Sequence, residues 1–362
     1  MKKNPNRILL SGGGTGGSVT PLIALVEELK LNNDGLEFLW LGTKKGIEFE
    51  MVDEAAIPYV SIASGKFRRY FSLFNISDIL KIFYGFWQSL FVLLKFKPAI
   101  VVTAGSFVAV PVAIAAWVLR IPVLVHQMDF VPGLANRIMA PFARVITVVF
   151  ARSLNDYGAK ARLIGNPVRP EIKKVHLLDR QNAIHRFGFK DDLPIILVVG
   201  GGTGAEAINK LVVESLAELT LHARIIHQTG ASKTRSENNP RYIAFDFLDS
   251  TTLTESFAAS DIVISRAGLG FITEISYLGK PMVLIPMPNS HQEENARMIG
   301  EMNAAIVLKQ NELTPELFAK IIMKLLEDKK LLDELAVSSK KIMPANAAEA
   351  MAEIVTETLI NG

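Results

Sequence analysis

Two glycine-rich loops carry the strongest chemical signal in this sequence of 362 residues. Each follows a short apolar run, precedes a helix-like segment and fits the pattern G-x-G-x-x-G/A, at Gly12, Gly14 and Gly17 and again at Gly200, Gly202 and Ala205. Glycines let backbone N–H groups approach an anion, and the following helix N-terminus adds partial positive charge. The loops therefore predict phosphate binding. A close strand–helix crossing without a ligand is the alternative at each loop.

A dinucleotide cofactor is the first candidate ligand, and the sequence argues against it. In NAD-binding folds an acidic residue at the end of the second strand holds the adenine ribose. The matching strand of the first half ends at Thr43-Lys44-Lys45, and that of the second half ends in IIHQTG. Neither offers a carboxylate there, so a nicotinamide-dependent oxidoreductase is a poor alternative.

A carboxylate does follow a later strand. The strand ends at Ser265-Arg266, a glycine-containing loop follows, and Glu274 lies in the first turns of the next helix. Such a carboxylate can accept both hydroxyls of a ribose, while the helix start receives phosphates. Gln292 and Asn295 follow the next strand, so polar groups converge where α/β sheets bind ligands. The alternative is that these groups cap helices and face solvent.

Parallel strands must position these motifs. Apolar β-branched runs alternate with helical patterns, which predicts parallel sheets covered on both faces. The predicted strands cover residues 7–11, 37–42, 99–104, 122–126, 144–149, 195–199, 224–228, 243–247, 261–265, 281–285 and 305–308. Both halves open with a strand, a glycine loop and a helix. This repetition favours an α/β protein of two doubly wound, Rossmann-like domains.

The proline-containing segment Gly165–Lys174 predicts the linker between the domains. The predicted domains are therefore residues 1–164 and 165–343, followed by a terminal segment 344–362 that contains a helix over 345–360.

The amino-acid composition limits which cellular compartment and which binding partners are compatible with the sequence. There is no cysteine, which excludes disulfides, thiolate metal sites and a cysteine nucleophile, and fits a reducing compartment. A net charge of +3 is too small to indicate nucleic acid as a partner. The apolar run behind the basic N-terminus is too short for a signal peptide, so a cytoplasmic protein is expected.

Several separated motifs resemble, in order, those of the MurG family of glycosyltransferases. They are GGTGG at 13–17, IPVLVHQ and PGLANR within 121–137, GNPVR at 165–169, VVGGGTGA at 198–205, HQTG at 227–230, SRAG at 265–268 and HQEENA at 291–296. The resemblance covers nearly the whole chain. It implies transfer of GlcNAc from UDP-GlcNAc to undecaprenyl-pyrophosphoryl-MurNAc-pentapeptide, the lipid I to lipid II step of peptidoglycan synthesis. It also implies a GT-B fold, in which two Rossmann-like domains face a cleft and the last helix returns to the N-terminal domain.

The same resemblance implies roles for matching positions. Glu274 would hold the uridine ribose, Leu248 would contact uracil through its backbone, and Gln292 would contact GlcNAc. Arg169 and the helix start would face the pyrophosphate, the helix start being Leu269, Gly270, Phe271, Ile272 and Thr273. The remaining donor-side positions are Thr15, Gly16, Gly17, Gly202, Thr203 and Asn295, of which 15–17 would lie near the reacting centre or the acceptor's pyrophosphate.

The sequence departs from the family where a general base is needed. The family's GGTGGH ends here in Ser18, its HEQN is HQMD at 126–129, and its GGSQG is GGGTG at 200–204. An unaided serine is no base near neutral pH. Because a carboxylate appears where an imidazole is lost, we predict Asp129 as the base and His126 as the second choice, with Ser18 retained as a catalytic position. Capping of a turn before Pro132 is the alternative for Asp129.

The resemblance implies an inverting displacement. Helix dipoles, backbone N–H groups and Arg169 are expected to stabilise the leaving diphosphate. No D-x-D pair is present, and Asp191-Asp192 precedes a strand. Neither a metal nor another cofactor is therefore expected.

The stretch 66–98 is aromatic and flanked by cations, which suits a membrane interface. Its apolar core is too short to span a bilayer. We predict contact with the cytoplasmic leaflet of the cell membrane through Lys66, Arg68, Arg69, Phe71, Phe74, Phe83 and Trp87. The alternative for part of the stretch is a buried helix with an exposed basic loop.

Two further functions stay open. One is a related transferase with another nucleotide sugar or lipid acceptor. The other is a catalytically inactive UDP-sugar-binding scaffold at the membrane, which Ser18 favours.

Overall fold

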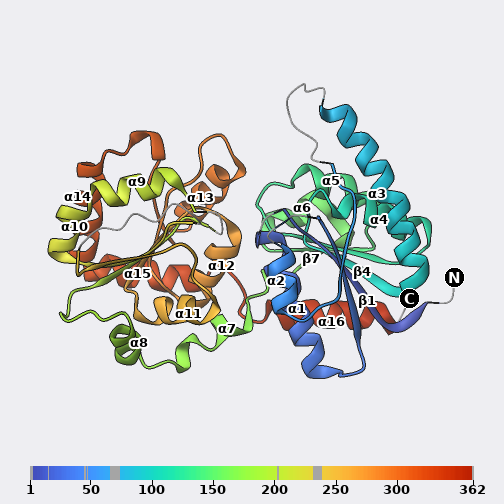
Figure 1. Ribbon diagram of the computed structural model, residues 1–362, viewed down its shortest axis with the longest axis horizontal. Coiled ribbons are helices and arrows are strands. Elements are labelled where there is room, and N and C mark those ends of the chain that lie inside the picture. The colour runs from blue at the N-terminus through green and yellow to red at the C-terminus, as the bar shows by residue number, and fades with distance from the viewer. Residues whose placement is uncertain are drawn as a thin grey trace. The chain divides into compact units, whose positions relative to one another are not determined.

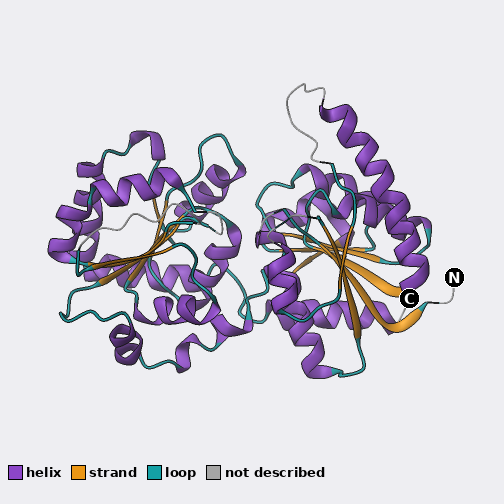
Figure 2. Cartoon of the chain, viewed as in Figure 1, coloured by secondary structure: helices purple, strands orange, loops and turns teal. Residues whose placement is uncertain are grey.

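The structure is a computed structural model that describes residues 3–14, 16–44, 46, 48–65, 74–201, 204–230 and 239–360, with side chains of the helix over 74–96 described from residue 80. The chain forms two compact units, unit 1 (Met1–Arg169 and Pro344–Gly362) and unit 2 (Pro170–Met343). Each is a sheet flanked by helices (Figures 1 and 2).

Unit 1 contains a seven-stranded sheet in the order β3-β2-β1-β4-β5-β6-β7, with parallel pairing throughout. Its strands are β1 (Asn4–Ser11), β2 (Glu37–Gly42), β3 (Tyr59–Ser61), β4 (Pro98–Thr103), β5 (Val123–Gln127), β6 (Val145–Val148) and β7 (Ala161–Leu163). The strand order reverses between β1 and β4. Open α/β sheets bind ligands at the carboxyl edge beside such a reversal.

Helices cover both faces of this sheet because successive residues of β1 point to opposite sides. Ile8 and Leu10 pack with α1 and α16, whereas Leu9 packs with α3, α4 and α5. The helices of unit 1 are α1 (Thr20–Asn32), α2 (Glu48–Glu54), α3 (Phe74–Phe96), α4 (Ala109–Val118), α5 (Leu134–Met139), α6 (Leu154–Tyr157) and α16 (Ala347–Ile360). Met351 and Val355 of α16 are fully buried in this core. Figure 1 shows α16, in red, beside α1.

Unit 2 contains a six-stranded parallel sheet in the order β10-β9-β8-β11-β12-β13. Its strands are β8 (Ile195–Val199), β9 (Arg224–Gln228), β10 (Tyr242–Phe245), β11 (Ile262–Ser265), β12 (Met282–Leu284) and β13 (Ile306–Val307). Its helices are α7 (Pro170–Lys173), α8 (Arg180–Arg186), α9 (Glu206–Glu214), α10 (Leu216–His222), α11 (Ser250–Ala259), α12 (Leu269–Leu278), α13 (His291–Glu301), α14 (Pro315–Glu327) and α15 (Lys329–Lys340). The strand order reverses between β8 and β11, which gives unit 2 a ligand-binding edge of its own.

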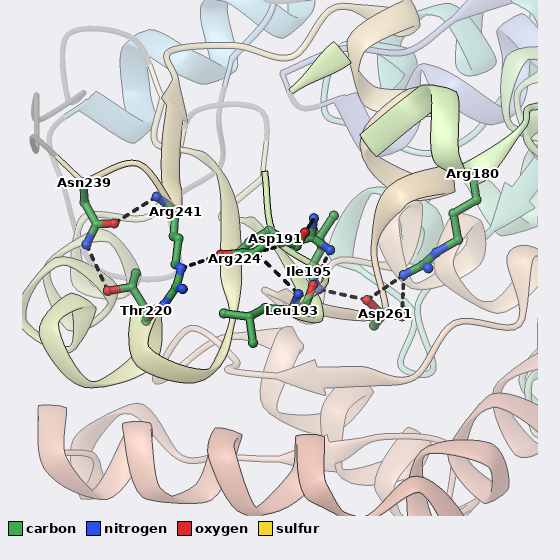
Figure 3. A network of polar contacts seen from close by, with 9 residues as sticks. All are labelled: Arg180, Asp191, Leu193, Ile195, Thr220, Arg224, Asn239, Arg241 and Asp261. Carbon is green, nitrogen blue, oxygen red and sulfur yellow. Dashed lines mark hydrogen bonds and ion pairs between the residues drawn. The ribbon is translucent and has the colours of Figure 1, made fainter. Parts of the chain in front are cut away.

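The opposite, amino edge of the second sheet is closed by ion pairs (Figure 3). The Arg180 guanidinium contacts both oxygens of Asp261 at 2.7 and 2.8 Å, and Asp261 also accepts a hydrogen bond from the Ile195 amide at 2.8 Å. Arg241 donates to Asp191 at 2.6 Å. These charges hold the strand starts together, so Asp191 serves the fold.

The predicted pair of doubly wound parallel sheets is confirmed. The boundaries of β2, β8 and β9 match the sequence prediction, and the sequence analysis missed β3 and β7.

Candidate functional site at the carboxyl edges

Ser18 supports the first glycine loop. Its buried Oγ accepts a hydrogen bond from the Gly13 amide at 3.1 Å and donates to the Gly13 carbonyl at 3.2 Å. The Trp40 indole donates to the Gly12 carbonyl at 3.0 Å. Because the Ser18 hydroxyl binds both the N–H and the carbonyl of Gly13, it fixes the conformation of the glycine loop. This geometry gives Ser18 a role in supporting the loop, and its catalytic role stays a prediction.

Glu48 is a site residue that the sequence analysis missed. Its side chain is fully buried, and its carboxylate accepts hydrogen bonds from the Gly14 amide at 3.0 Å and the Thr43 amide at 2.8 Å. The Thr43 hydroxyl also donates to it. Glu48 therefore lies just beyond β2 and binds the glycine loop itself. The sequence feature that could have pointed to Glu48 is an acidic residue in the first turn of the helix after β2.

Hydrogen bonding outweighs burial at Glu48. Burial raises the pKa of this carboxyl group. The hydrogen bonds from Thr43 and Gly14 together lower the pKa by more than burial raises it, so the net pKa lies below the ordinary value of 4.5. Glu48 is therefore ionised near neutral pH, and its carboxylate holds the first glycine loop.

Replacing Glu48 by glutamine is expected to lower the free energy of unfolding near pH 7 by about 1–3 kcal/mol, because buried amide donors lose an ionised acceptor. A depressed folded-state pKa contributes stability above the ordinary pKa of 4.5, and this contribution is lost as pH falls through the lower folded value. Urea unfolding across that range should therefore show a weaker acid dependence for E48Q than for the wild type. Glu50→Gln, at an exposed position of α2, is the control; equal acid slopes for wild type and E48Q would contradict the assignment.

His126, which is predicted as the second choice for the base, is held by hydrogen bonds inside unit 1. Its ring is fully buried, Nδ1 lies 2.9 Å from the Thr147 hydroxyl, and Nε2 lies 2.9 Å from Asn166 Oδ1. Burial lowers the pKa of His126 to about 4. The neutral ring ties β5 to β6 and to the segment after β7, so it is poorly placed to take a substrate proton.

Asp129 lies half-buried on the loop after β5, at the same edge of the sheet as the glycine loop. The Gln127 side-chain amide donates to the Asp129 carbonyl at 2.7 Å. Gln127 is itself fixed, because Asn136 and Tyr157 donate to its Oε1. The backbone that carries the Asp129 carboxylate is therefore held from inside the unit.

The second glycine loop follows β8 and packs against the end of β9. Gly204 has φ +69°, and a Cβ there would lie 1.9 Å from the Thr229 carbonyl oxygen, so only glycine fits. Gln228 joins this loop to another segment, donating to Gly201 O at 3.2 Å and accepting from Leu248 N at 3.0 Å. The Leu248 amide thus already has a protein partner.

Glu274 lies in the second turn of α12, beside the reversal between β8 and β11, and is 4% exposed. The helix start combines buried side chains of Leu269, Ile272 and Thr273 with the half-buried Gly270 and Phe271. The predicted contact with phosphate would therefore come from backbone N–H groups at this helix start.

Two buried side chains shape the neighbouring loops of unit 2. Arg266 donates to the carbonyls of Ile285 and Pro286 at 3.0 and 3.1 Å. Asn295 is 1% exposed and donates to the Ala267 carbonyl at 3.2 Å. Asn295 therefore supports the loop before α12, and its contact with the donor stays a prediction.

Gln292 stays half-buried near the same edge. Its Oε1 accepts a hydrogen bond from the Met287 amide at 3.1 Å. This bond orders the loop between β12 and α13.

The other predicted positions are placed as follows. Arg169 is half-buried as the last residue of the first segment of unit 1, and Gly16 and Gly17 form part of a short 3-10 helix. Among the residues that the structure describes, no cluster of His, Asp and Glu has the geometry of a metal site. The predicted positions that lie outside the described residues are Thr15, Gly202, Thr203, Lys66, Arg68, Arg69 and Phe71, and the Phe74 side chain is likewise not described.

Family comparisons agree with this architecture. Residues 8–148 match the glycosyltransferase family 28 N-terminal domain, and residues 195–354 match its C-terminal domain. A UDP-N-acetylglucosamine--N-acetylmuramyl-(pentapeptide) pyrophosphoryl-undecaprenol N-acetylglucosamine transferase from Clostridium botulinum is 38% identical over 89% of this chain and 92% of its own length. The Legionella pneumophila transferase of the same name is 35% identical over 97% of this chain and 96% of its own.

Solved structures share the fold. MurG from Acinetobacter baumannii aligns with a TM-score of 0.73 and 24% identity, covering 98% of this chain and all (100%) of that one. The glycosyltransferase of kitacinnamycin aligns with a TM-score of 0.74 and 17% identity, covering 98% and 100% of the two chains. The fold, both domain matches and the extended sequence identity together place this chain in the MurG family of glycosyltransferases, within glycosyltransferase family 28.

Proposed function

We propose that this chain transfers GlcNAc from UDP-GlcNAc to undecaprenyl-pyrophosphoryl-MurNAc-pentapeptide. The observation that carries the proposal is the extended identity to transferases of that name, spanning about nine-tenths of both chains. The buried Glu274 at the ligand-binding edge of unit 2 supports the nucleotide half of the assignment. We assign the donor to unit 2 and the acceptor to unit 1.

The proposed reaction is a single inverting displacement. A sugar hydroxyl of the acceptor attacks C1 of GlcNAc, the new O–C1 bond forms as the C1–O bond to UDP breaks, and UDP leaves with the bonding electrons. Asp129 takes the hydroxyl proton as general base. Backbone N–H groups at the start of α12, together with Arg169, stabilise the charge on the leaving diphosphate.

Glu274 is proposed to accept hydrogen bonds from the uridine ribose. The further donor contacts proposed from the family pattern involve Leu248 and Gln292, and Gly16 and Gly17 are proposed to lie near the acceptor. No metal or other cofactor is assigned to the chemistry, because helix N-termini and cationic side chains stabilise diphosphates directly.

The first experiment measures transfer of radiolabelled GlcNAc from UDP-GlcNAc to a lipid I analogue, with and without EDTA. We expect labelled lipid product at similar rates in both. UDP binding without product on any lipid-linked acceptor would support the scaffold alternative. Loss of product in EDTA with recovery in magnesium would overturn the metal-free mechanism.

We also propose that α3 docks unit 1 on the inner leaflet of the cell membrane. An apolar stripe runs along the helix with spacings of three and four residues, and its exposed members are Leu80, Phe83, Tyr84, Trp87, Phe91 and Leu94. Lys95 lies at the end of the stripe. Among the described helices none is long and apolar enough to cross a bilayer. An aromatic stripe with a flanking cation favours binding in the interfacial plane.

Replacing both Phe83 and Trp87 by serine is expected to lower partitioning onto anionic liposomes about tenfold or more, since two exposed aromatic side chains no longer enter the interface. Flotation of the folded variant beside the wild type measures the effect. Leu221→Ser is the matched control, because Leu221 is an exposed apolar residue of unit 2. Equal flotation of wild type and double variant would count against docking through α3.

A further inference from the structure

The loop between β4 and α4 contains the most unusual backbone among the described non-glycine residues. Ser106 has φ +86°, whereas the other described non-glycine residues with positive φ lie between 51° and 57°. Its neighbour Gly105 has φ +88°. Ser106 therefore adopts a conformation suited to glycine, which costs an L-residue conformational energy.

The Ser106 side chain reaches the first glycine loop. Its Oγ donates a hydrogen bond to the Gly13 carbonyl at 2.6 Å. The adjacent Phe107 ring lies so close to Gly14 that a Cβ on Gly14 would sit 2.8 Å from it. The β4–α4 loop thus contacts the glycine loop at two successive residues, directly beside the strand reversal between β1 and β4.

The same loop also lies beside α5, whose Asn136 binds the residue that holds the Asp129 loop. A Cβ on Gly105 would lie 2.9 Å from Asn136 Oδ1, and the Asn136 amide donates to Gln127. Gln127 in turn fixes the Asp129 carbonyl. The β4–α4 loop therefore lies between the glycine loop and the loop of the proposed base within one unit, with Ser106 bound to Gly13 and its neighbour Gly105 beside Asn136.

We propose that Ser106 is a positioning residue for transfer: its hydroxyl sets the glycine loop relative to Asp129, and its strained backbone is retained for that purpose. This inference rests on the proposed function and adds a residue that the sequence motifs do not single out. A positioning error near 1 Å at a reacting centre lowers turnover by up to about 100-fold.

Two variants separate the hydroxyl from the backbone conformation. Ser106→Ala removes the hydroxyl and keeps the Cβ at positive φ, whereas Ser106→Gly removes both. We expect kcat to fall by a similar factor of about 10–100 in both variants. The unfolding midpoint should be higher for S106G than for S106A, because glycine tolerates positive φ. Ala56→Gly is the control, since Ala56 is an exposed residue of unit 1 with φ +51° and should keep wild-type kcat.

If Ser106 only stabilised the fold, kcat would follow the unfolding midpoint, and the more stable S106G would be the more active variant. Wild-type kcat in S106G would therefore overturn the proposal. Hydrogen exchange of the segment 12–18 provides a second readout, and we expect faster exchange in both Ser106 variants but not in A56G. If the wild type makes no lipid product, the proposed function fails, but hydrogen exchange still tests whether Ser106 holds the glycine loop. Unchanged exchange of the segment 12–18 in S106G refutes that role.

Discussion

Asp129→Asn is expected to lower kcat for GlcNAc transfer about 10²–10⁴-fold while leaving KM for UDP-GlcNAc nearly unchanged. The acceptor hydroxyl must lose its proton as it attacks, and an amide cannot take it. The structure favours Asp129 for this role because His126 is enclosed by Thr147 and Asn166, and Ser18 is engaged with Gly13. The Asp129 carboxylate lies on the loop after β5, whose backbone Gln127 holds.

Steady-state kinetics with varied UDP-GlcNAc and a lipid I analogue measure this effect. Asp53→Asn, at an exposed position of α2, is the matched control and should keep wild-type kcat. UDP affinity and the unfolding midpoint of D129N report whether the variant is folded. A folded D129N enzyme with normal turnover would remove Asp129 from the mechanism and restore the turn-capping interpretation.

Glu274→Gln is expected to weaken UDP binding about 10- to 100-fold, because the ribose hydroxyls lose an ionised acceptor and such hydrogen bonds contribute about 1.5–3 kcal/mol. Glutamine keeps the volume of this buried position, so the expected loss reports the charge and the acceptor oxygen. Calorimetric titration with UDP measures the change.

A ribose contact has a sharper signature than a loss of affinity. Removal of the 2′-hydroxyl from UDP should weaken binding to the wild type more than to E274Q, so the two changes should be non-additive. Glu327→Gln, exposed at the end of α14, is the control for loss of a carboxylate in unit 2. Additive effects of the nucleotide and protein changes would place Glu274 away from the ribose.

The fold was predictable from sequence where strands are buried on both faces. β8 and β9 are wholly buried. β8 is a continuous apolar run, which is typical of a strand buried on both faces, and β9 has Ile225 and Ile226 at its centre. β3 and β7 were missed because each is a three-residue edge strand with exposed positions, and the pattern of so short a segment is weak. Each of these short strands is formed by pairing with a neighbouring strand, β2 or β6, and the local sequence does not show that pairing.

The site was less predictable because its supports are distant in sequence. Glycine spacing located both loops, and Glu274 was found from its place after a strand. Glu48 meets Gly14 across 34 positions of chain, and Ser106 meets Gly13 across 93. No local pattern encodes those pairings. The hydrogen bonds that Ser18 and His126 make inside unit 1 were likewise not predicted, because their motifs were read only for chemistry.

The return of α16 to the first unit has a consequence for the order in which the protein is made. Residues 170–343 form an uninterrupted unit, whereas unit 1 combines the start of the chain with its last helix. A nascent chain emerges from its N-terminus, so the first sheet leaves the ribosome early but waits for Met351 and Val355, which cover one of its faces together with α1. The N-terminal unit is therefore completed after unit 2, and premature termination before α16 leaves part of one hydrophobic face of that unit uncovered.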